Sequence, residues 1–367
     1  MKRTNIAVFL IILAAFAVVV TCFPRDPRTL TDENRSYNRF PELTRDGILG
    51  GTFNTAFEAW LSDRVGYRAD FVAASRSVTA LAGIARDAQV RGNLLVFPDR
   101  LMEIFIRNRA TEAAYAAALT AYRDALPESV RVFSILAPTQ IEFQPATYRS
   151  VADSERDAIA DVYEQLHQYG VVTVDAYAEL KARADEYIYF RTDHHWTARG
   201  AYCAYLAFAE AAGLNPVPLE AYAETALSGF HGYLYRLSPS PKLADAPDTL
   251  YYYANPEIET SPPLLYLPPE GEKPTYQVFL GGDRDSMAIT TNANNGKTAV
   301  VIKDSYANSF IPWLAPHYDT IVVLDPRSFT GSAIDEILKY PDADVIFINY
   351  VLSTTFGDFI DRIDKIR

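Results

Sequence analysis

The segment AVVIKDSYAN, residues 299–308, carries the pattern on which the predicted fold depends. Its first four residues are apolar, as in a strand buried on both faces, and a helix is predicted to begin near Tyr306. Short apolar runs of the same kind alternate with helical patterns elsewhere, at 130–137, 171–174, 320–324 and 344–348. This alternation predicts an α/β fold in which a mostly parallel sheet has helices on both faces.

Ser305 stands between the strand and the helix of that segment, at the carboxyl edge of the predicted sheet. The backbone N–H of a serine at a helix start can stabilise an oxyanion, so Ser305 is a candidate nucleophile. A Ser or Asp at such a junction can equally be a simple helix N-cap. The G-x-S-x-G elbow is absent from the sequence, which disfavours an ordinary α/β-hydrolase.

A second segment, TDHHWT at residues 192–197, holds two of the five histidines beside an aspartate. In extended backbone, residues two apart share a face, so we expect Asp193 and His195 to lie together and His194 to point away. A carboxylate beside an imidazole fixes its tautomer and stabilises its cation. Alternatively, Asp193 and Thr197 cap the following helix, or Asp193, His194 and His195 bind a metal, although no distant His or Glu set completes a ligand shell.

The composition argues against a nucleic-acid partner, because the formal net charge is −12 and no basic stripe offsets it. Hydrophobic residues make up 49% of the chain, so it can bury a sizeable core. The only cysteines, Cys22 and Cys203, predict neither a disulfide nor a zinc site.

The N-terminus predicts the compartment. Lys2 and Arg3 precede an uncharged apolar run that continues to Phe23, and spanning a bilayer takes roughly 20 such residues. Basic residues before the run stay in the cytoplasm, so the rest of the chain is expected outside it. We therefore expect a single-pass cell-membrane protein with a signal anchor over residues 1–24; signal cleavage and lipidation at Cys22 are the alternatives.

The two chemical segments together resemble the signature motifs of the bacterial DHHW family, which is similar to the SGNH-hydrolase-like proteins of alginate O-acetylation. Further segments fit the family pattern: ENR at 33–35, FPELT at 40–44, Asp63 with Gly66-Tyr67-Arg68, LAPTQIEFQP at 136–145, FLGGD at 279–283 and LDPR at 324–327. The resemblance implies an SGNH-hydrolase-like (flavodoxin-like) fold in which Asp and His precede the serine, a permuted order. One departure is Lys303-Asp304-Ser305 in place of G-D-S, which puts the local loop geometry in doubt.

The resulting domain prediction has three parts. Residues 1–24 form the anchor, residues 25–90 an N-terminal arm and helical extension, and residues 91–367 the SGNH-like α/β domain. The last part contains an insertion at about 213–274, which is rich in Pro, Tyr and Leu and has no clean periodicity.

The resemblance assigns roles to three residues: Ser305 as nucleophile, His195 as base and Asp193 as the carboxylate that orients it. Weaker candidates complete the site. Asn349 follows an apolar run where an SGNH enzyme presents its oxyanion asparagine, and Gly281 or Gly282 can supply a backbone donor or form a plain turn. Possible substrate contacts are Arg191, Tyr306 and Tyr235. No metal and no cofactor is predicted.

The function implied is an extracytoplasmic O-acyltransferase, specifically an O-acetyltransferase, that modifies a cell-surface or exported polysaccharide through an acyl-serine. The expected partner is a membrane-bound O-acyltransferase that exports the acetyl group. Two alternatives remain open: a carbohydrate esterase that uses the same triad, and a non-catalytic polysaccharide-binding assembly protein that keeps the fold.

Overall fold

The computed structural model describes residues 40–44, 89–144 and 151–367, together with Phe53, Phe57, Trp60, Leu61 and Arg64. The predicted anchor over 1–24, and most of the predicted arm and extension over 25–90, lie outside these residues. Within the described ranges, no helix has both the length and the apolar composition that crossing a bilayer requires.

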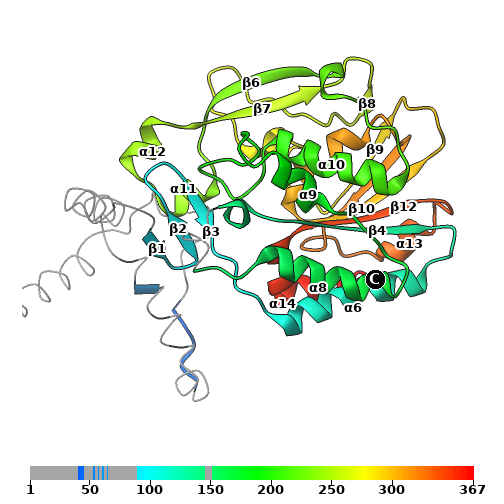
Figure 1. Ribbon diagram of the computed structural model, residues 1–367, viewed down its shortest axis with the longest axis horizontal. Helices are drawn as coiled ribbons and strands as arrows, with labels where there is room; N and C mark the ends of the chain where they lie inside the picture. The colour runs from blue at the N-terminus through cyan, green and yellow to red at the C-terminus, as the bar shows by residue number, and fades with distance from the viewer. Residues whose placement is uncertain are drawn as a thin grey trace, which may run out of the picture. The chain divides into compact units, whose positions relative to one another are not determined.

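The chain divides into two compact units. The first comprises Met1–Asp87 and Tyr235–Ala244, and the second comprises Ala88–Leu234 and Asp245–Arg367. Tyr235 belongs to the first unit, whereas all other candidate site residues belong to the second. The second unit is the α/β domain (Figure 1).

A seven-stranded sheet forms the centre of the second unit. Five strands run parallel and two antiparallel strands extend one edge, which confirms the predicted mixed α/β fold with a mostly parallel sheet. Across the sheet the strands are β5 (Val172–Thr173), β4 (Arg131–Ala137), β12 (Asp344–Tyr350), β10 (Thr298–Lys303), β11 (Thr320–Leu324), β9 (Ser286–Thr291) and β8 (Thr260–Ser261).

The order of the parallel strands is that of a circularly permuted flavodoxin-like sheet. Numbered from β10, through β11 and β12 and then β4 and β5, the strands lie in the order 2-1-3-4-5. Counted from the N-terminus the order is different, because the last strand, β12, lies between β4 and β10. In such sheets ligands bind at the carboxyl ends of strands 1 and 3, where the connections diverge to opposite sides. Here those strands are β10 and β12.

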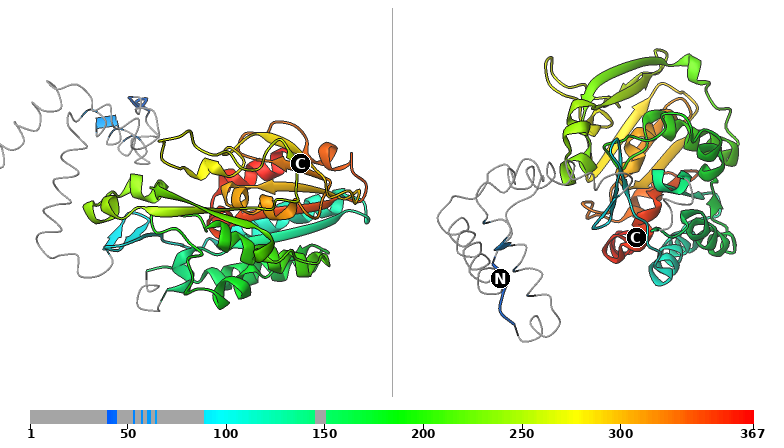
Figure 2. Two further views of the ribbon diagram at one scale, coloured as in Figure 1. Left: turned by 90° about the horizontal axis from the view of Figure 1, so that it is seen from above. Right: turned by 60° about the vertical axis from the view of Figure 1, so that its left-hand side comes forward.

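Two hydrophobic cores lie on opposite faces of the sheet, as the alternation along β10 shows: Ala299 and Val301 enter one core, and Val300 and Ile302 the other. Fully burying an aliphatic side chain of this kind contributes about 1.5–3 kcal/mol. Helices cover both faces (Figures 1 and 2). One face carries α6 (Arg109–Ala125), α8 (Glu155–His167), α13 (Ala333–Ile337) and α14 (Gly357–Lys365), and the other carries α9 (Ala176–Ala182) and α10 (Ala198–Ala212).

The predicted insertion at about 213–274 contains the antiparallel pair β6 (Ala223–Phe230) and β7 (Asp248–Ala254). Between them in the chain come α11 (Tyr233–Leu237) and α12 (Pro241–Asp245). A separate antiparallel sheet is formed by β1 (Gln89–Arg91), β2 (Leu94–Val96) and β3 (Leu101–Glu103).

One local prediction was wrong: the helix expected near Tyr306 is only a 3-10 turn, η4 (Ser305–Ser309). The segment around Tyr276 is also a short 3-10 helix, η3 (Tyr276–Val278). Tyr189 and Trp196 form a single antiparallel bridge.

A buried carboxyl group ties the loop after β4 to the start of α8. Glu155 is fully buried, and its two oxygens accept hydrogen bonds from the N–H and the hydroxyl of Thr139, each at 2.6 Å. Its own N–H donates to Glu142 at 2.9 Å. Burial raises the pKa of Glu155 to about 8, although the bonds from Thr139 oppose the rise.

This raised pKa predicts a pH dependence of stability. Between pH 5 and 8 the folded chain keeps a proton on Glu155 that the unfolded chain has lost, so the free energy of unfolding falls as pH rises. Relative to Glu155→Gln, the wild type should lose up to about 1.4 kcal/mol per pH unit in this window. Denaturant titrations at each pH measure the difference.

Glu164→Gln, an exposed change on the same helix, is the matched control and should follow the wild-type curve. Parallel curves for wild type and Glu155→Gln would show that Glu155 is ionised in the folded protein.

Candidate active site

The segment around Asp193 is a tight loop. It lies between Tyr189 and Trp196, which form a single antiparallel bridge, and its residues 191–195 are bends. Thr197 is the N-cap of α10, and its hydroxyl accepts from the N–H of Gly200 at 3.3 Å. The capping expectation is therefore correct for Thr197 and wrong for Asp193, whose side chain is used elsewhere.

The structure brings Asp193, His195 and Ser305 together. His195 Nδ1 lies 2.6 Å from Asp193 Oδ1, and His195 Nε2 lies 2.8 Å from Ser305 Oγ. Ser305 directly follows β10 and begins η4, at the carboxyl end of the sheet. Both nitrogens of one imidazole are thus engaged, one by a carboxylate and the other by a hydroxyl, which is the geometry of an activated serine.

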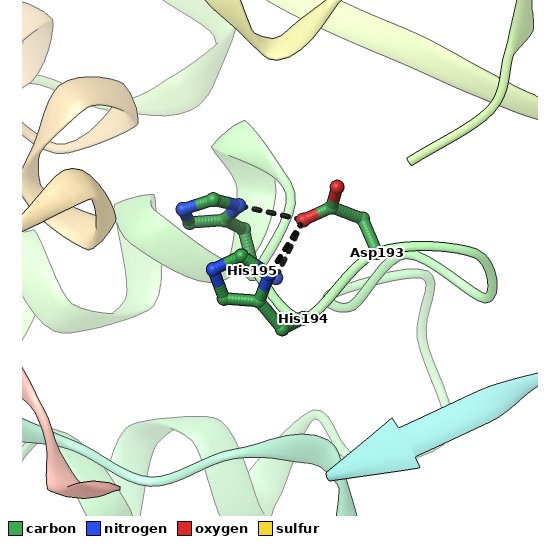
Figure 3. A group of neighbouring side chains, drawn as sticks. All are labelled: Asp193, His194 and His195. Atoms are coloured by element: carbon green, nitrogen blue, oxygen red, sulfur yellow. Dashed lines mark hydrogen bonds and ion pairs between the residues drawn. The ribbon is translucent and has the colours of Figure 1, made fainter. Parts of the chain in front are cut away.

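His194 does not point away from its neighbours, so that expectation was wrong. Its ring centroid lies 3.9 Å from that of His195, and its Nδ1 lies 3.5 Å from Asp193 Oδ1 (Figure 3). The alternation argument fails because these residues form bends and not extended backbone. Burial and the neighbouring His195 lower the pKa of His194, which favours the neutral ring.

The carboxylate of Asp193 is held at several points. Asp193 Oδ1 accepts from the N–H of His195 at 3.0 Å, and Oδ2 accepts from the N–H of Tyr233 at 2.6 Å. Burial alone would raise the pKa of Asp193, but the facing imidazoles of His195 and His194 and these bonds hold it well below its usual range. The carboxylate therefore stays charged at neutral pH.

Gly232 permits this close approach. A Cβ placed on Gly232 would lie 2.2 Å from the Cβ of Asp193, closer than any side chain allows. The N–H of Gly232 also donates to the hydroxyl of Thr192 at 3.0 Å. Gly232 and Tyr233 come from the insertion at 213–274, so that segment helps to position the loop.

Asp248, the first residue of β7, fixes the loop from the other side and is also part of the insertion. Its carboxylate accepts from the N–H groups of Arg191 and Thr192, from the Thr192 hydroxyl, from Arg191 Nε and from the Tyr187 hydroxyl. Asp248 is 1% exposed. One buried carboxylate thus organises the two residues that immediately precede Asp193.

The serine turn has its own supports. Asp304 accepts from the N–H of Tyr306, the N–H of Tyr350 and the hydroxyl of Ser353 at 2.8–3.0 Å. Burial raises the pKa of Asp304, which these bonds partly oppose. Two further bonds join the turn to the histidine loop: Trp196 Nε1 donates to Tyr306 O at 2.9 Å, and the Tyr306 hydroxyl donates to His194 O.

Lys303, the departure from G-D-S, does not disturb this geometry. Its side chain is 1% exposed and its ammonium contacts Asp283 at 2.8 Å and Asp325 at 3.0 Å. Asp283 also accepts from Asn308 Nδ2 at 2.9 Å and pairs with Arg327. The FLGGD and LDPR segments thus supply the carboxylates that neutralise a lysine buried at the end of β10.

Tyr276 covers one face of the His195 imidazole, and the sequence analysis did not predict this role. Its ring is stacked on His195, with centroids 3.8 Å apart and planes within 10°. Its hydroxyl bonds to Ser309 Oγ at 2.9 Å. Burial raises the pKa of Tyr276 well above its usual value, so the hydroxyl stays neutral.

The weaker candidates are placed as follows. Asn349 lies within β12, fully buried; its Oδ1 accepts from the Tyr115 hydroxyl at 2.8 Å, and its Nδ2 has no partner among the described residues. Gly282 has φ 92° and donates its N–H to Phe279 O at 3.1 Å, so that donor is used within a turn. The hydroxyl of Tyr306 and the guanidinium of Arg191 have the protein partners described above.

The metal alternative involves the same side chains as the triad. Asp193, His194 and His195 each present a ligand atom, all within 4.8 Å of one another. However, Asp193 Oδ1 and both ring nitrogens of His195 are already at hydrogen-bond distance from protein atoms. The donor set therefore fits a hydrogen-bonded triad better than an ion, which would have to displace these bonds.

Sequence signals for the missed residues were weak. Gly232, Tyr233 and Asp248 lie in a stretch without periodicity, and Tyr276 stands among many tyrosines.

The DHHW protein family matches residues 85–261. The structure is similar to that of a DHHW family protein from Eubacterium siraeum, with 28% identity and a TM-score of 0.68 over 76% of this chain and 96% of that chain. No curated protein shows a significant match to the sequence.

Two more distant structures are also similar. Bacillus cereus PatB1, in a structure with a sulfonyl adduct, is 20% identical with a TM-score of 0.61, covering 74% of this chain and 98% of PatB1. The O-acetyltransferase domain of Pseudomonas putida AlgJ is 19% identical with a TM-score of 0.44, covering 77% and 99%. The family match spans the Asp193–His195 loop, and a solved DHHW family protein has a similar fold, so this chain is similar to the DHHW protein family over its α/β unit.

Proposed function

We propose that this chain is an extracytoplasmic O-acyltransferase that transfers an acetyl group to a hydroxyl of a cell-surface or exported polysaccharide. The observation that carries the proposal is that both ring nitrogens of His195 are at hydrogen-bond distance from a partner: Asp193 at 2.6 Å and Ser305 at 2.8 Å. A serine held in this way can form a covalent acyl-enzyme without any cofactor.

In the first half-reaction, His195 Nε2 takes the proton of Ser305 as Oγ attacks the carbonyl carbon of the acyl donor. Asp193 stabilises the imidazolium that forms. The bond from the carbonyl carbon to the leaving group then breaks, and the leaving group receives the proton from His195. Ser305 is left as an ester.

In the second half-reaction a sugar hydroxyl takes the place of the leaving group. His195 removes its proton as its oxygen attacks the acyl-serine, and the proton returns to Ser305 when the ester bond breaks. The N–H of Ser305, at the start of η4, is the proposed oxyanion donor. Asn349 Nδ2 is a second candidate, because it is buried and has no partner among the described residues.

The donor, partner and compartment are part of the proposal. Acetyl is the group expected from the family's similarity to proteins of alginate O-acetylation, with a membrane-bound O-acyltransferase supplying it. The apolar run before Phe23 supports a single-pass anchor that holds the α/β unit outside the cytoplasm.

Replacing the nucleophile is the first test. Ser305→Ala should lower the turnover of p-nitrophenyl acetate by about a thousandfold or more, because no other group can form the acyl-enzyme. Intact-mass measurement should detect one acetyl group on the quenched wild type and none on the variant. An arylsulfonyl fluoride should likewise label only the wild type.

Ser286→Ala, an exposed serine on β9, is the control and should behave as wild type. Acetylated product formed with added oligosaccharide supports a transferase, whereas release to water alone identifies an esterase. Absence of turnover and of labelling in the wild type would instead indicate a non-catalytic protein.

The orienting carboxylate gives a second prediction. Asp193→Asn removes the charge facing His195 and can turn an amide N–H toward Nδ1, which selects the wrong tautomer. We expect kcat to fall by about a hundredfold or more while the fold, followed by circular dichroism, is retained. Asp185→Asn, an exposed change before the loop, is the control. A kcat within twofold of wild type would remove Asp193 from the mechanism.

Tyr276 is a positioning residue and gives a third prediction. Tyr276→Phe keeps the ring that stacks on His195, whereas Tyr276→Leu removes it. Because an aromatic face stabilises a neighbouring cation, Tyr276→Leu should lower kcat about tenfold with KM little changed. Tyr276→Phe should restore kcat to near the wild-type value. Equal kcat in wild type and Tyr276→Leu would limit Tyr276 to packing.

A further inference from the structure

A pocket of about 380 Å³ lies in the second unit, between the β6–β7 pair and the residues that flank the catalytic loop. Its size is in the range of small-molecule sites, about 300–1,000 Å³. Arg191 and Thr197, which line it, stand two residues before Asp193 and two residues after His195. The pocket is therefore built on the same loop as the proposed base. Its main lining side chains are Tyr187, Arg191, Arg199, Glu224, Tyr251 and Tyr253.

One wall of the pocket is aromatic. Side chains two apart on a strand share a face, and Thr249, Tyr251 and Tyr253 of β7 all line the pocket. Tyr187 faces them from the catalytic-loop side, with its ring centroid 6.2 Å from that of Tyr251. Tyrosine offers an apolar ring face and a polar hydroxyl together, a combination that suits the C–H face and hydroxyl rim of a sugar ring.

The two arginines in the pocket are already paired with carboxylates. Arg191 contacts Asp248 at 3.1 Å and donates to two backbone carbonyls, and Arg199 contacts Glu186 at 3.0 Å. Glu224 is exposed and accepts the Tyr253 hydroxyl at 2.6 Å, which leaves further lone pairs of its carboxylate for a ligand. A sugar hydroxyl can donate to Glu224, whereas a carboxylate ligand would be repelled by it and would have to compete for both arginines.

We propose that this pocket binds a neutral sugar unit of the acceptor polysaccharide, so that the chain acts on a neutral glycan and not on a polyuronate. The assignment of the pocket to an acceptor rests on the proposed function. Tyr251 supplies the stacking surface and Glu224 accepts hydroxyl hydrogen bonds. The sugar is held beside the loop that carries His195.

Equilibrium binding tests the pocket independently of turnover. The full-length chain carrying Ser305→Ala is titrated calorimetrically with three probes: cellohexaose, an N-acetylglucosamine hexamer and a mannuronate hexamer. We expect at least one neutral hexamer to bind, and to bind more tightly than the mannuronate hexamer. Adding Tyr251→Ala should weaken that binding about tenfold, the loss of one aromatic contact. Glu224→Ala should weaken it several-fold.

Tyr252→Ala is the matched control, because Tyr252 is the next residue on β7 and points to the opposite face. Binding by this variant should equal that of its parent, and thermal unfolding of all variants should be checked first. Tighter binding of mannuronate, no binding of either neutral hexamer, or equal weakening by Tyr251→Ala and Tyr252→Ala would overturn the proposal.

The two proposals fail in different ways. If wild type forms the acyl-enzyme but neutral hexamers bind equally to the parent and to both pocket variants, the pocket assignment is wrong and the proposed function stands. If neutral hexamers bind through Tyr251 and Glu224 but wild type never forms an acyl-enzyme, the sugar site stands and the transferase does not.

Discussion

The imidazole of His195 is the group around which the α/β unit is organised, because its two nitrogens must meet partners from distant parts of the chain. Asp193 comes from the same loop, but Ser305 is 110 residues away and is placed by β10. The distances to both partners are kept by a rigid sheet on one side and a tightly bonded loop on the other. Stacking by Tyr276 then fixes the plane of the ring. The proposed chemistry tolerates little displacement of these atoms.

Few of these constraints come from the residues of the proposed triad. Gly232, Tyr233 and Asp248 hold the loop that carries Asp193 and His195. All three belong to the insertion at 213–274, whose sequence has no regular hydrophobic pattern. Asp304 and the pair formed by Lys303 with Asp325 hold the serine turn. The side chains of Asp248, Asp304, Lys303 and Asp325 are buried, so removing one of them would leave a polar partner unsatisfied in the interior.

The sequence was sufficient for the sheet and for the three central residues. Apolar runs such as 299–303 and 344–348 form strands because a buried sheet accommodates them. Two polar segments, TDHHWT and Lys303-Asp304-Ser305, interrupt the alternation of strands and helices and so marked the candidate site. The orientation of His194 was not predictable, because bends replaced extended backbone. The roles of Tyr276 and Asp248 were not predictable either. The imidazole that Tyr276 stacks on and the loop residues that Asp248 holds lie more than 50 residues away, and no local pattern encodes such contacts. The anchor and the extension are still predictions.

The position of β12 in the sheet has a consequence for how the protein is made. This strand is the last in the chain, yet it lies between β4 and β10, and the ion pair of Arg131 with Asp344 spans 213 residues. A nascent chain that lacks β12 already contains β4 and β10, but no strand lies between them. The edges of β4 and β10 that pair with β12 therefore stay unpaired. Sheet closure therefore waits until β12 has been synthesised, and contacts of such long sequence separation favour slow folding. Until β12 is in place, the turn after β10 lacks the bonds from Asp304 to Tyr350 and Ser353, so Ser305 is not yet held in its final position.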